Sequence, residues 1–425
     1  MTASCTGRSA PSQSLSMAEH RHDVAIAGAG AVGATLALAL KHAGLDVVLV
    51  DAGGLASDSR STLIAAGCFR QWEALGVGAA IAAGSQAVHA VQVADGPGPG
   101  ASDRGGVPAW LRFDAADLGG GEAGGPLGYM VENPHLHTVL DKALAEAGVP
   151  VRKARVLGLA AGPREATITL DDGSTLAATL AVGAEGRRSA VRAAAGIKVW
   201  GWDYPQSGVA ATIALERPHE GVAQQYFLKS GPLAVLPLTG QRASLVWSER
   251  RDAAEALVAA SPEAFEAHLT RRFGEFLGRP RLIGARMSFP LSLQAASSMT
   301  AARVALAGDA AHGMHPIAGQ GLNLGLKDVA TLAEVIVEAR RLGEDWGSPL
   351  VLDRYASWRR VDVMSALAGT ELFVRVFSGA DPIVRRVRSA GLALVGSSPL
   401  ARRLFTREAT GALGETPRLL RGERP

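Results

Sequence analysis

Apolar residues dominate the beginning of the chain from Val24 to Leu40, without the alternation expected of a half-exposed strand. An unbroken apolar run is typical of a parallel strand buried on both faces, so we expect a strand over His22–Ala27. A helix is predicted over Ala34–His42 and a second strand over Asp46–Val50. Because the run is slightly short for a membrane span and contains glycines, a buried strand–turn–helix unit explains it better.

The turn of this unit is Gly28-Ala29-Gly30-Ala31-Val32-Gly33, a GxGxxG pattern. In such a pattern Gly28 allows the tight turn, Gly30 lets the backbone approach a pyrophosphate, and Gly33 lets helix and strand pack closely. Asp51 ends the second strand 18 residues beyond Gly33, near the spacing expected of a ribose-binding acid. The unit predicts dinucleotide binding, with a glycine-rich turn in a plain α/β fold as the alternative.

A second glycine-rich pattern extends from Arg303 to Val329. A predicted strand, Arg303–Ala307, ends in Gly308-Asp309, and a helix is expected to begin at about Gln320. A carboxylate at a strand tip beside the free N–H groups of a helix start favours a polyhydroxylated, phosphorylated cofactor. Two cofactor contacts about 260 residues apart indicate one long cofactor that stays bound during turnover, which points to FAD.

The middle of the chain has a different pattern, with short strand-like runs separated by turn residues and no helices between them. This predicts an antiparallel sheet. Ala87–Phe113 is expected to be a hairpin that joins the same sheet, Pro262–Leu277 an amphipathic helix, and Leu282–Leu293 a further strand. The predicted strands of the sheet are Gln206–Leu215, Ala223–Leu228, Leu233–Leu238 and Ala243–Trp247.

Length and composition set outer bounds on these predictions. A chain of 425 residues is long enough for two or three domains. The net charge of +3 gives no argument for a nucleic-acid partner. With only Cys5 and Cys68, we expect neither a disulfide framework nor a cysteine metal site, and a cytoplasmic location is the default. Among the other residues no metal cluster stands out in the sequence. Residues 1–20 lack the apolar core of a secretory signal and are predicted to be a disordered tail.

Further motifs reveal a family resemblance. They are Asp58-Ser59-Arg60, Gly183-Ala184-Glu185-Gly186-Arg187-Arg188-Ser189-Ala190-Val191-Arg192, and GDAAHGMHPIAGQGLNLGLKD from Gly308 to Asp328. In this order, after the GxGxxG start, they resemble the FAD-dependent aromatic hydroxylases (flavoprotein monooxygenases), most closely the ubiquinone-biosynthesis hydroxylase family. The resemblance covers about residues 22–410. Glu185 departs from it, because the family has Asp there. The longer side chain is either tolerated or lowers the efficiency of flavin reduction.

The resemblance implies an α/β fold with a Rossmann-like FAD-binding domain, interrupted by a substrate domain with an antiparallel β-sheet and followed by C-terminal helices. We predict a discontinuous FAD-binding domain of residues 21–84, 126–198 and 298–345. The substrate domain is predicted to comprise residues 85–125 and 199–297, and the C-terminal helical region residues 346–425.

The resemblance also implies roles for single residues. Asp51 would hold the adenosine ribose, Arg60 would contact the pyrophosphate or the flavin side, and Asp309 would bind ribityl hydroxyls. The helix start near Gly319 would stabilise the anionic reduced flavin. Open alternatives are a solvated strand end for Asp51, a surface ion pair for Arg60 and a helix cap for Asn133. The expected cofactor contacts are Gly28, Gly30, Val32, Gly33, Asp51, Arg60, Asn133, Glu185, Gly308, Asp309, Pro316, Gly319, Gly321, Leu322 and Asn323.

We expect no catalytic side chain, because in such enzymes the flavin carries the difficult chemistry. His312 is expected to order its loop by hydrogen bonding, and His135 and His137 to lie on a helix surface. The substrate pocket is predicted to include residues for which core packing is the alternative: Trp202, Tyr204, Leu236, Pro237, Trp247, Phe289, Pro290 and, beside Pro316, His315.

The resemblance implies a reaction in which NADPH or NADH reduces FAD, and O2 then forms a flavin C4a-hydroperoxide that hydroxylates a phenolic ring. The leading prediction is a polyprenylated phenol of ubiquinone biosynthesis. One alternative is a soluble aromatic substrate, whose charge would need an arginine on the sheet, where Arg242 and Arg286 are the candidates. The other alternative is a flavin-binding accessory protein with little turnover.

The last part of the chain, from Glu371 to Pro425, carries ten arginines against five acidic residues, with apolar residues interleaved. A basic amphipathic surface of this kind predicts peripheral contact with the inner face of a membrane. Because a polyprenyl substrate resides in the bilayer, we expect the enzyme to contact the membrane. A place in a quinone-biosynthesis complex is a further expectation. A solvated basic face is the alternative.

Overall fold

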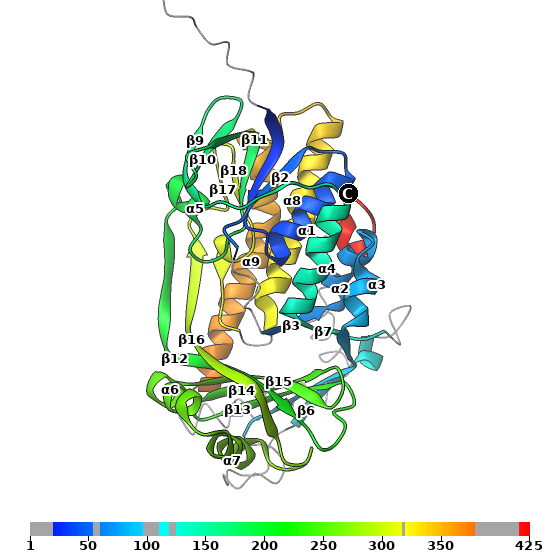
Figure 1. The fold of residues 1–425 in the computed structure, drawn as a ribbon, viewed down its shortest axis with the longest axis vertical. Coiled ribbons are helices and arrows are strands. Elements are labelled where there is room, and N and C mark those ends of the chain that lie inside the picture. The colour runs from blue at the N-terminus through cyan, green and yellow to red at the C-terminus, as the bar shows by residue number, and fades with distance from the viewer. Residues whose placement is uncertain (1–19, 54–59, 97–109, 119–124, 317–318, 379–415) are drawn as a thin grey trace, which may run out of the picture.

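The structure is a computed structural model that describes residues 20–53, 60–96, 110–118, 125–316, 319–378 and 416–425. Figure 1 shows a body of helices around one sheet, with a second sheet below it. Two long strands, β12 (Val199–Ala214) and β16 (Arg281–Ala296), extend from the body to the second sheet. The α/β fold expected from the sequence is confirmed.

The first sheet has the strand order β17-β18-β11-β1-β2-β8, and β10 joins it through β11 and pairs with β9. β1 lies parallel between β2 and β11, and its residues Val24–Ala27 are buried. This agrees with the unbroken apolar pattern, because a central parallel strand is covered on both faces. The strands are β1 (Arg21–Ala27), β2 (Val47–Val50), β8 (Val151–Arg152), β9 (Val156–Ala161), β10 (Ala166–Leu170), β11 (Thr175–Gly183), β17 (Thr300–Ala301) and β18 (Val304–Leu306).

Helices cover this sheet, and α1 contacts both α4 and α8. Small residues along α1 let these helices approach closely, and Leu36, Leu140 and Leu332 share one buried cluster. The short 3₁₀ turn η6 (Arg418–Arg421) returns to pack on α2 and α8. The helices are α1 (Ala31–His42), α2 (Ala66–Ala74), α3 (Gly78–Ala83), α4 (Asn133–Glu146), α5 (Ala190–Ala194) and α8 (Gln320–Arg341).

The second sheet has the order β19-β16-β12-β15-β14-β13-β5-β6 and is antiparallel except where β5 meets β13. The predicted hairpin is confirmed, because β5 and β6 pair with each other at one edge of this sheet. Its turn, residues 97–109, lies outside the described residues. The strands not yet given are β5 (Ala90–Ala94), β6 (Trp110–Asp114), β13 (Val222–Leu228), β14 (Gly231–Leu238), β15 (Arg242–Arg250) and β19 (His312–Gly313).

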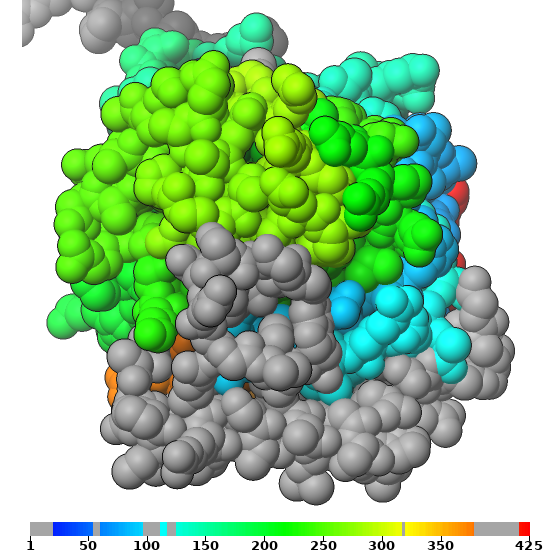
Figure 2. Space-filling model, turned by 90° about the horizontal axis from the view of Figure 1, so that it is seen from below, coloured from blue at the N-terminus to red at the C-terminus, as the bar shows by residue number. Residues whose placement is uncertain are grey.

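Helices α6 (Arg251–Ala259) and α7 (Pro262–Phe273) pack on the outer face of the second sheet, where Phe265 and Phe273 are fully buried. Figure 2 shows this end of the molecule, formed largely by the green and yellow-green residues of the second sheet and its helices. A third, small sheet has the order β3-β7-β4. Its strands are β3 (Ser61–Ala65), β7 (Gly128–Glu132) and β4 (Ser85–Val88).

Helix α9 (Pro349–Ser378) begins beside the first sheet and reaches strands β13 and β14 of the second. The predicted disordered tail, Asp58 and Ser59 of the D-x-R loop, and most of the basic C-terminal segment lie outside the described residues. None of the helices described here is both long and apolar enough to cross a membrane. The division of the chain into domains stays a prediction.

Candidate functional site

A cavity of about 1710 Å³ lies between the first and second sheets. It exceeds the usual range of about 300–1,000 Å³ for a small-molecule site, so it has room for more than one small ligand. Gly28, Asp51 and Ala184 lie in its wall, each directly after a strand of the first sheet, and so does Gly308, two residues after β18. The cavity therefore opens at the carboxyl edge of the parallel strands, where α/β sheets bind ligands.

The first glycine loop forms a backbone cradle at this edge. Gly28 has φ +100°, and a Cβ atom there would lie 2.5 Å from the carbonyl oxygen of Ala184. A Cβ atom on Gly33 would lie 1.9 Å from the carbonyl oxygen of Gly28, so only glycine lets α1 pack on the turn. Gly30 is the N-cap of α1 without a side-chain cap. The first N–H groups of α1 are therefore available to an anionic group.

The carboxylate of Asp51 lies beside this cradle. Its Oδ2 accepts a hydrogen bond from the N–H of Ala29 at 2.8 Å, and its Oδ1 accepts one from the N–H of Gly53 at 2.7 Å. Each oxygen keeps a lone pair for a ligand hydroxyl. Asp51 is half-buried and lies in the cavity wall, so the geometry fits the predicted ribose contact better than a solvated strand end.

The second glycine-rich pattern supplies the facing part of the wall. Gly308 has φ +62°, and a Cβ atom there would lie 3.0 Å from the Cγ2 atom of Val32, so the two patterns touch. Gly319, in the left-handed conformation, is the N-cap of α8 and has no side-chain cap. The predicted helix start at Gln320 is confirmed. The residues of its first turn line the cavity.

Asn323 also anchors the strand that follows the D-x-R loop. Its Oδ1 accepts from the N–H of Ala65 at 2.8 Å, and its Nδ2 donates to the carbonyl oxygen of Leu63 at 2.8 Å. These bonds join α8 to β3 across more than 250 residues of sequence. Asn133 is the first residue of α4, whose N-cap is Glu132, so the helix-cap alternative for Asn133 is not supported.

A buried ion network fixes the loop after β18. Oδ2 of Asp328 accepts from Nε2 of His312 at 2.6 Å and from the N–H of Gly308 at 2.9 Å, and Oδ1 accepts from Nε of Arg359 at 2.7 Å. Burial alone would raise the pKa of Asp328, but the adjacent His312 and Arg359 lower it below its usual value. The prediction that His312 orders its loop is confirmed.

Glu185 turns back onto its own loop. Its Oε1 accepts a hydrogen bond from the N–H of Val191 at 2.8 Å, in the first turn of α5. Burial raises the pKa of this carboxyl. The longer side chain is therefore accommodated within the loop. Its effect on flavin reduction stays a prediction.

His315 does not line the cavity. Its side chain is almost fully buried, edge-on to the ring of Tyr204 at 5.3 Å between ring centroids. Burial, helped by Arg187, lowers the pKa of His315 to about 4, so the imidazole is neutral near pH 7. Tyr204 donates from its hydroxyl to Glu371 at 2.6 Å and is also absent from the wall. The structure places both residues behind the wall, not in the substrate pocket predicted from sequence.

The prediction for Trp247 and Pro237 was one residue out of register. Side chains alternate between the two faces of a strand, and the cavity wall contains Val246 and Leu236, of which Leu236 was also a candidate. Trp247 is fully buried on the other face, against Phe265 of α7. Phe289 does line the cavity. With it, the wall of the second sheet includes Ala210, Ala234, Leu236, Ser244, Val246 and Met287.

Sequence reasoning did not place Arg187, Glu132 or His137 in the wall. Arg187 donates to the carbonyl oxygens of Ser292 and Met314, at 3.1 and 2.9 Å, and so connects the two sheets. Arg242 and Glu132 form an ion pair in the wall. His137 lines the cavity from α4, so its predicted place on a helix surface was wrong. His135 is half-buried too, with its Nε2 3.1 Å from the carbonyl oxygen of Ile81.

The expected cofactor residues converge on this cavity. All of them lie in its wall except Gly33, which packs beneath the first turn. A cradle that only glycine fits, two uncapped helix starts, and carboxylates at Asp51 and Asp309 suit a long ligand with phosphate and polyol groups. These residues therefore fit FAD, and each residue's own contact with it stays a prediction.

Comparison with known proteins agrees with this site. A family model described as an FAD binding domain matches residues 21–370. The chain is 43% identical to the ubiquinone hydroxylase UbiL of Rhodospirillum rubrum over 413 residues, 94% of this chain and 92% of that protein. It is 34% identical to the 3-demethoxyubiquinol 3-hydroxylase of Escherichia coli over 406 residues, 92% of this chain and 98% of that protein.

A solved structure shares the fold. The p-nitrophenol 4-monooxygenase PnpA of Pseudomonas putida aligns with a TM-score of 0.77 at 21% identity, over 93% of this chain and 100% of that one. At 21% identity this similarity shows a shared fold, that is, the same arrangement of sheets and helices.

Proposed function

This chain belongs to the FAD binding domain family, and we propose that it hydroxylates the phenolic ring of a polyprenylated precursor in ubiquinone biosynthesis. It is an FAD-dependent aromatic hydroxylase. FAD, reduced by NADPH or NADH, supplies the chemistry that activates O2 for insertion of one oxygen atom into the ring. The two bacterial relatives named for ubiquinone hydroxylation support this substrate class.

The observation that carries the proposal is the neutral, largely apolar wall that the second sheet presents to the cavity. Nη2 and Nη1 of Arg242 donate to the two carboxylate oxygens of Glu132 at 2.8 and 3.2 Å. A bidentate pair of this kind neutralises the guanidinium. Arg286, the other candidate, donates to the carbonyl oxygen of Ala260 and stacks over Phe265 at 5.1 Å. Arg286 does not line the cavity, so in the described part of the sheet neither arginine presents an unpaired charge to a substrate there.

The protein's own contribution is to position and to desolvate. Phe289, Met287 and Leu236 give the substrate ring and chain an apolar surface that excludes water. The uncapped start of α8 places N–H groups where negative charge on the reduced cofactor would be stabilised. His315 behind the wall is neutral near pH 7, so it adds no positive charge that would attract an anionic substrate. A neutral polyprenyl phenol meets these conditions, whereas a benzoate would leave its carboxylate unpaired.

Deleting the gene from its native host tests the proposal. We expect a loss of ubiquinone and the accumulation of a prenylated phenol that lacks one ring hydroxyl, identified by mass spectrometry of lipid extracts. Re-expression of the chain should restore the quinone. An unchanged quinone profile in the deletion strain would contradict the proposal.

The ion pair in the wall gives a second prediction. Glu132→Gln leaves the charge of Arg242 unbalanced, so kcat/KM for a neutral alkyl phenol should fall about tenfold relative to that for a hydroxybenzoate. The ratio is measured with purified enzyme and NADPH. Glu146→Gln is the matched control, because Glu146 forms an exposed pair with Lys142 on the same helix. Equal losses on both substrates would contradict a role of the pair in specificity.

Peripheral membrane contact belongs to the same proposal. The basic segment that motivates it lies mostly in residues 379–415, outside the described residues, so its support is the sequence pattern alone. Flotation with anionic liposomes should carry the protein upward at low salt and release it at high salt. Absence of the protein from the floating fraction at low salt would contradict this part of the proposal.

A further inference from the structure

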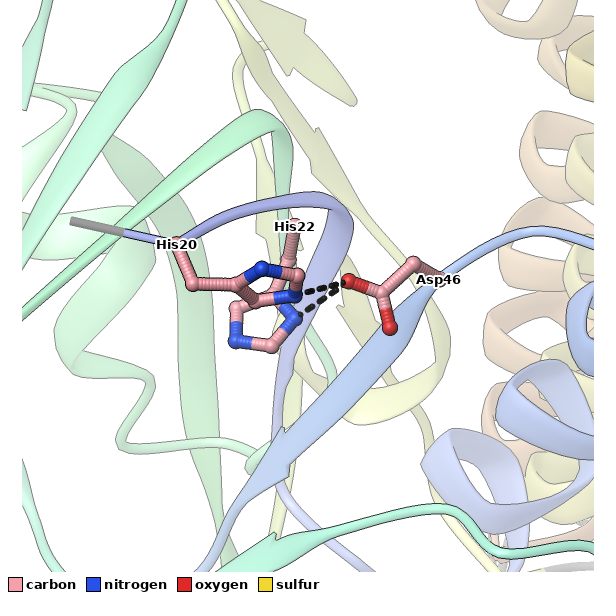
Figure 3. A group of neighbouring side chains, drawn as sticks. All are labelled: His20, His22 and Asp46. Atoms are coloured by element: carbon pink, nitrogen blue, oxygen red, sulfur yellow. Dashed lines mark hydrogen bonds and ion pairs between the residues drawn. The ribbon is translucent and has the colours of Figure 1, made fainter. Parts of the chain in front are cut away.

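Three possible metal ligands meet at the amino ends of the first two strands. His20 precedes β1, His22 is its second residue, and Asp46 immediately precedes β2 (Figure 3). Residues two apart on an extended chain point to the same side. Since Val24 of β1 is in register with Val47 of β2, the parallel pairing brings Asp46 next to both histidines.

The geometry of this cluster is convergent. Nε2 of His20 and Nδ1 of His22 both lie 2.8 Å from Oδ2 of Asp46. The three candidate ligand atoms lie within 4.8 Å of one another. Ligand atoms around a tetrahedral Zn²⁺, with bonds near 2.1 Å, are about 3.4 Å apart. The two nitrogen–oxygen distances of 2.8 Å are shorter than this value, and the distance between the two nitrogens is at most 4.8 Å. Small side-chain rotations therefore bring all three atoms to bonding distance from one ion.

The backbone holds the carboxylate in place. The N–H of Asp46 donates to Oδ2 of Asp23 at 2.9 Å, and its carbonyl oxygen accepts from the N–H groups of Asp23 and Val24 at 2.9 and 3.1 Å. His22 is largely enclosed, with 13% of its side chain exposed, whereas His20 is 74% exposed. The sheet thus fixes Asp46, its surroundings partly enclose His22, and the exposed side chain of His20 can turn towards an ion.

We propose that His20, His22 and Asp46 form a binding site for a divalent transition-metal cation, with Zn²⁺ the best match. Two imidazole nitrogens and one carboxylate oxygen are the ligands that Zn²⁺ accepts, and Ca²⁺ or Mg²⁺ would instead prefer oxygen alone. The exposed side of the cluster leaves a position for water. Bound metal joins the residue before β1 to the start of β2 and stabilises the sheet edge.

The site is separate from the cofactor cavity. The cavity lies at the carboxyl ends of β1 and β2, and the cluster lies at their amino ends. The six residue steps from His22 to Gly28, at about 3.3 Å each, put the two sites about 20 Å apart. The metal is therefore expected to affect stability and not the flavin chemistry.

The test uses the full chain without a histidine tag, loaded with FAD and freed of metal by chelator treatment. Cys5, the cysteine in the preceding segment, is changed to Ser in every sample so that its thiol cannot bind zinc. Zn²⁺ is titrated in competition with a chromogenic chelator. We expect one Zn²⁺ per chain, and at least about tenfold weaker binding after His20→Ala or Asp46→Asn. His268→Ala, which removes an exposed histidine from α7, is the matched control and should bind like the parent.

Two further readouts separate a metal site from simple histidine–carboxylate hydrogen bonding. Cu²⁺ should give an electron paramagnetic resonance spectrum with coupling to two nitrogens, reduced to one in His20→Ala. Zn²⁺ should raise the melting temperature of the parent but not of His20→Ala, with FAD content unchanged in both. No stoichiometric zinc in the parent, or equal binding by His20→Ala and the parent, would overturn the proposal. Neither outcome depends on hydroxylase activity.

Discussion

The buried carboxylate of Asp328 is the constraint on which the rest of the site depends. It is fully inaccessible to solvent, and it binds the N–H of Gly308, the imidazole of His312 and the guanidinium of Arg359. These partners come from the end of β18, from β19 and from α9. Removing one member of a buried ion network typically costs about 3–5 kcal/mol, because the remaining charges stay buried without compensation. A single side chain of α8 therefore sets the path of the loop that faces the cofactor.

The same loop belongs to both sheets. His312 and Gly313 form β19, which pairs with Ala295 and Gln294 of β16, so the loop anchored by Asp328 is also an edge of the second sheet. Arg187 strengthens the link by binding Ser292 of β16 and Met314 of the loop. The loop thus fixes the distance between two walls of the cavity. One is the wall expected to face FAD, and the other is the wall proposed to face the substrate. This arrangement explains how one cavity can present a cofactor and a neutral aromatic ring to each other.

Local patterns allowed much of the site to be predicted. The glycines at Gly28 and Gly33, the acid at Asp51 and the helix start at Gln320 each follow from short-range geometry, and all were placed correctly along the chain. The substrate wall could not be predicted as well, because a shift of one residue moves every side chain of a strand to its other face. Trp247 was a candidate for the substrate pocket, whereas its neighbour Val246 lines the cavity.

Long-range ion pairs could not be predicted from the sequence. Glu132 and Arg242 are 110 residues apart, and neither a charge pattern nor a periodicity relates them. The pairing of His312 with Asp328 was partly accessible, because both belong to one motif and a histidine in a tight loop commonly orders its own backbone. The fold, the cofactor and the enzyme class followed from motifs, while the pairing of Arg242 in the cavity wall of the second sheet required the structure.

The retention of FAD by Asp328→Asn tests this account most directly. Asn keeps the shape of the side chain but cannot balance Arg359, whereas Asp362→Asn removes only the half-exposed partner of Arg359. Both variants are passed through gel filtration, and the flavin absorbance per chain is measured together with the far-ultraviolet circular dichroism. We predict a folded Asp328→Asn protein that has lost most of its FAD, and an Asp362→Asn protein that retains it. An Asp328→Asn protein that binds FAD as tightly as the parent would contradict the account.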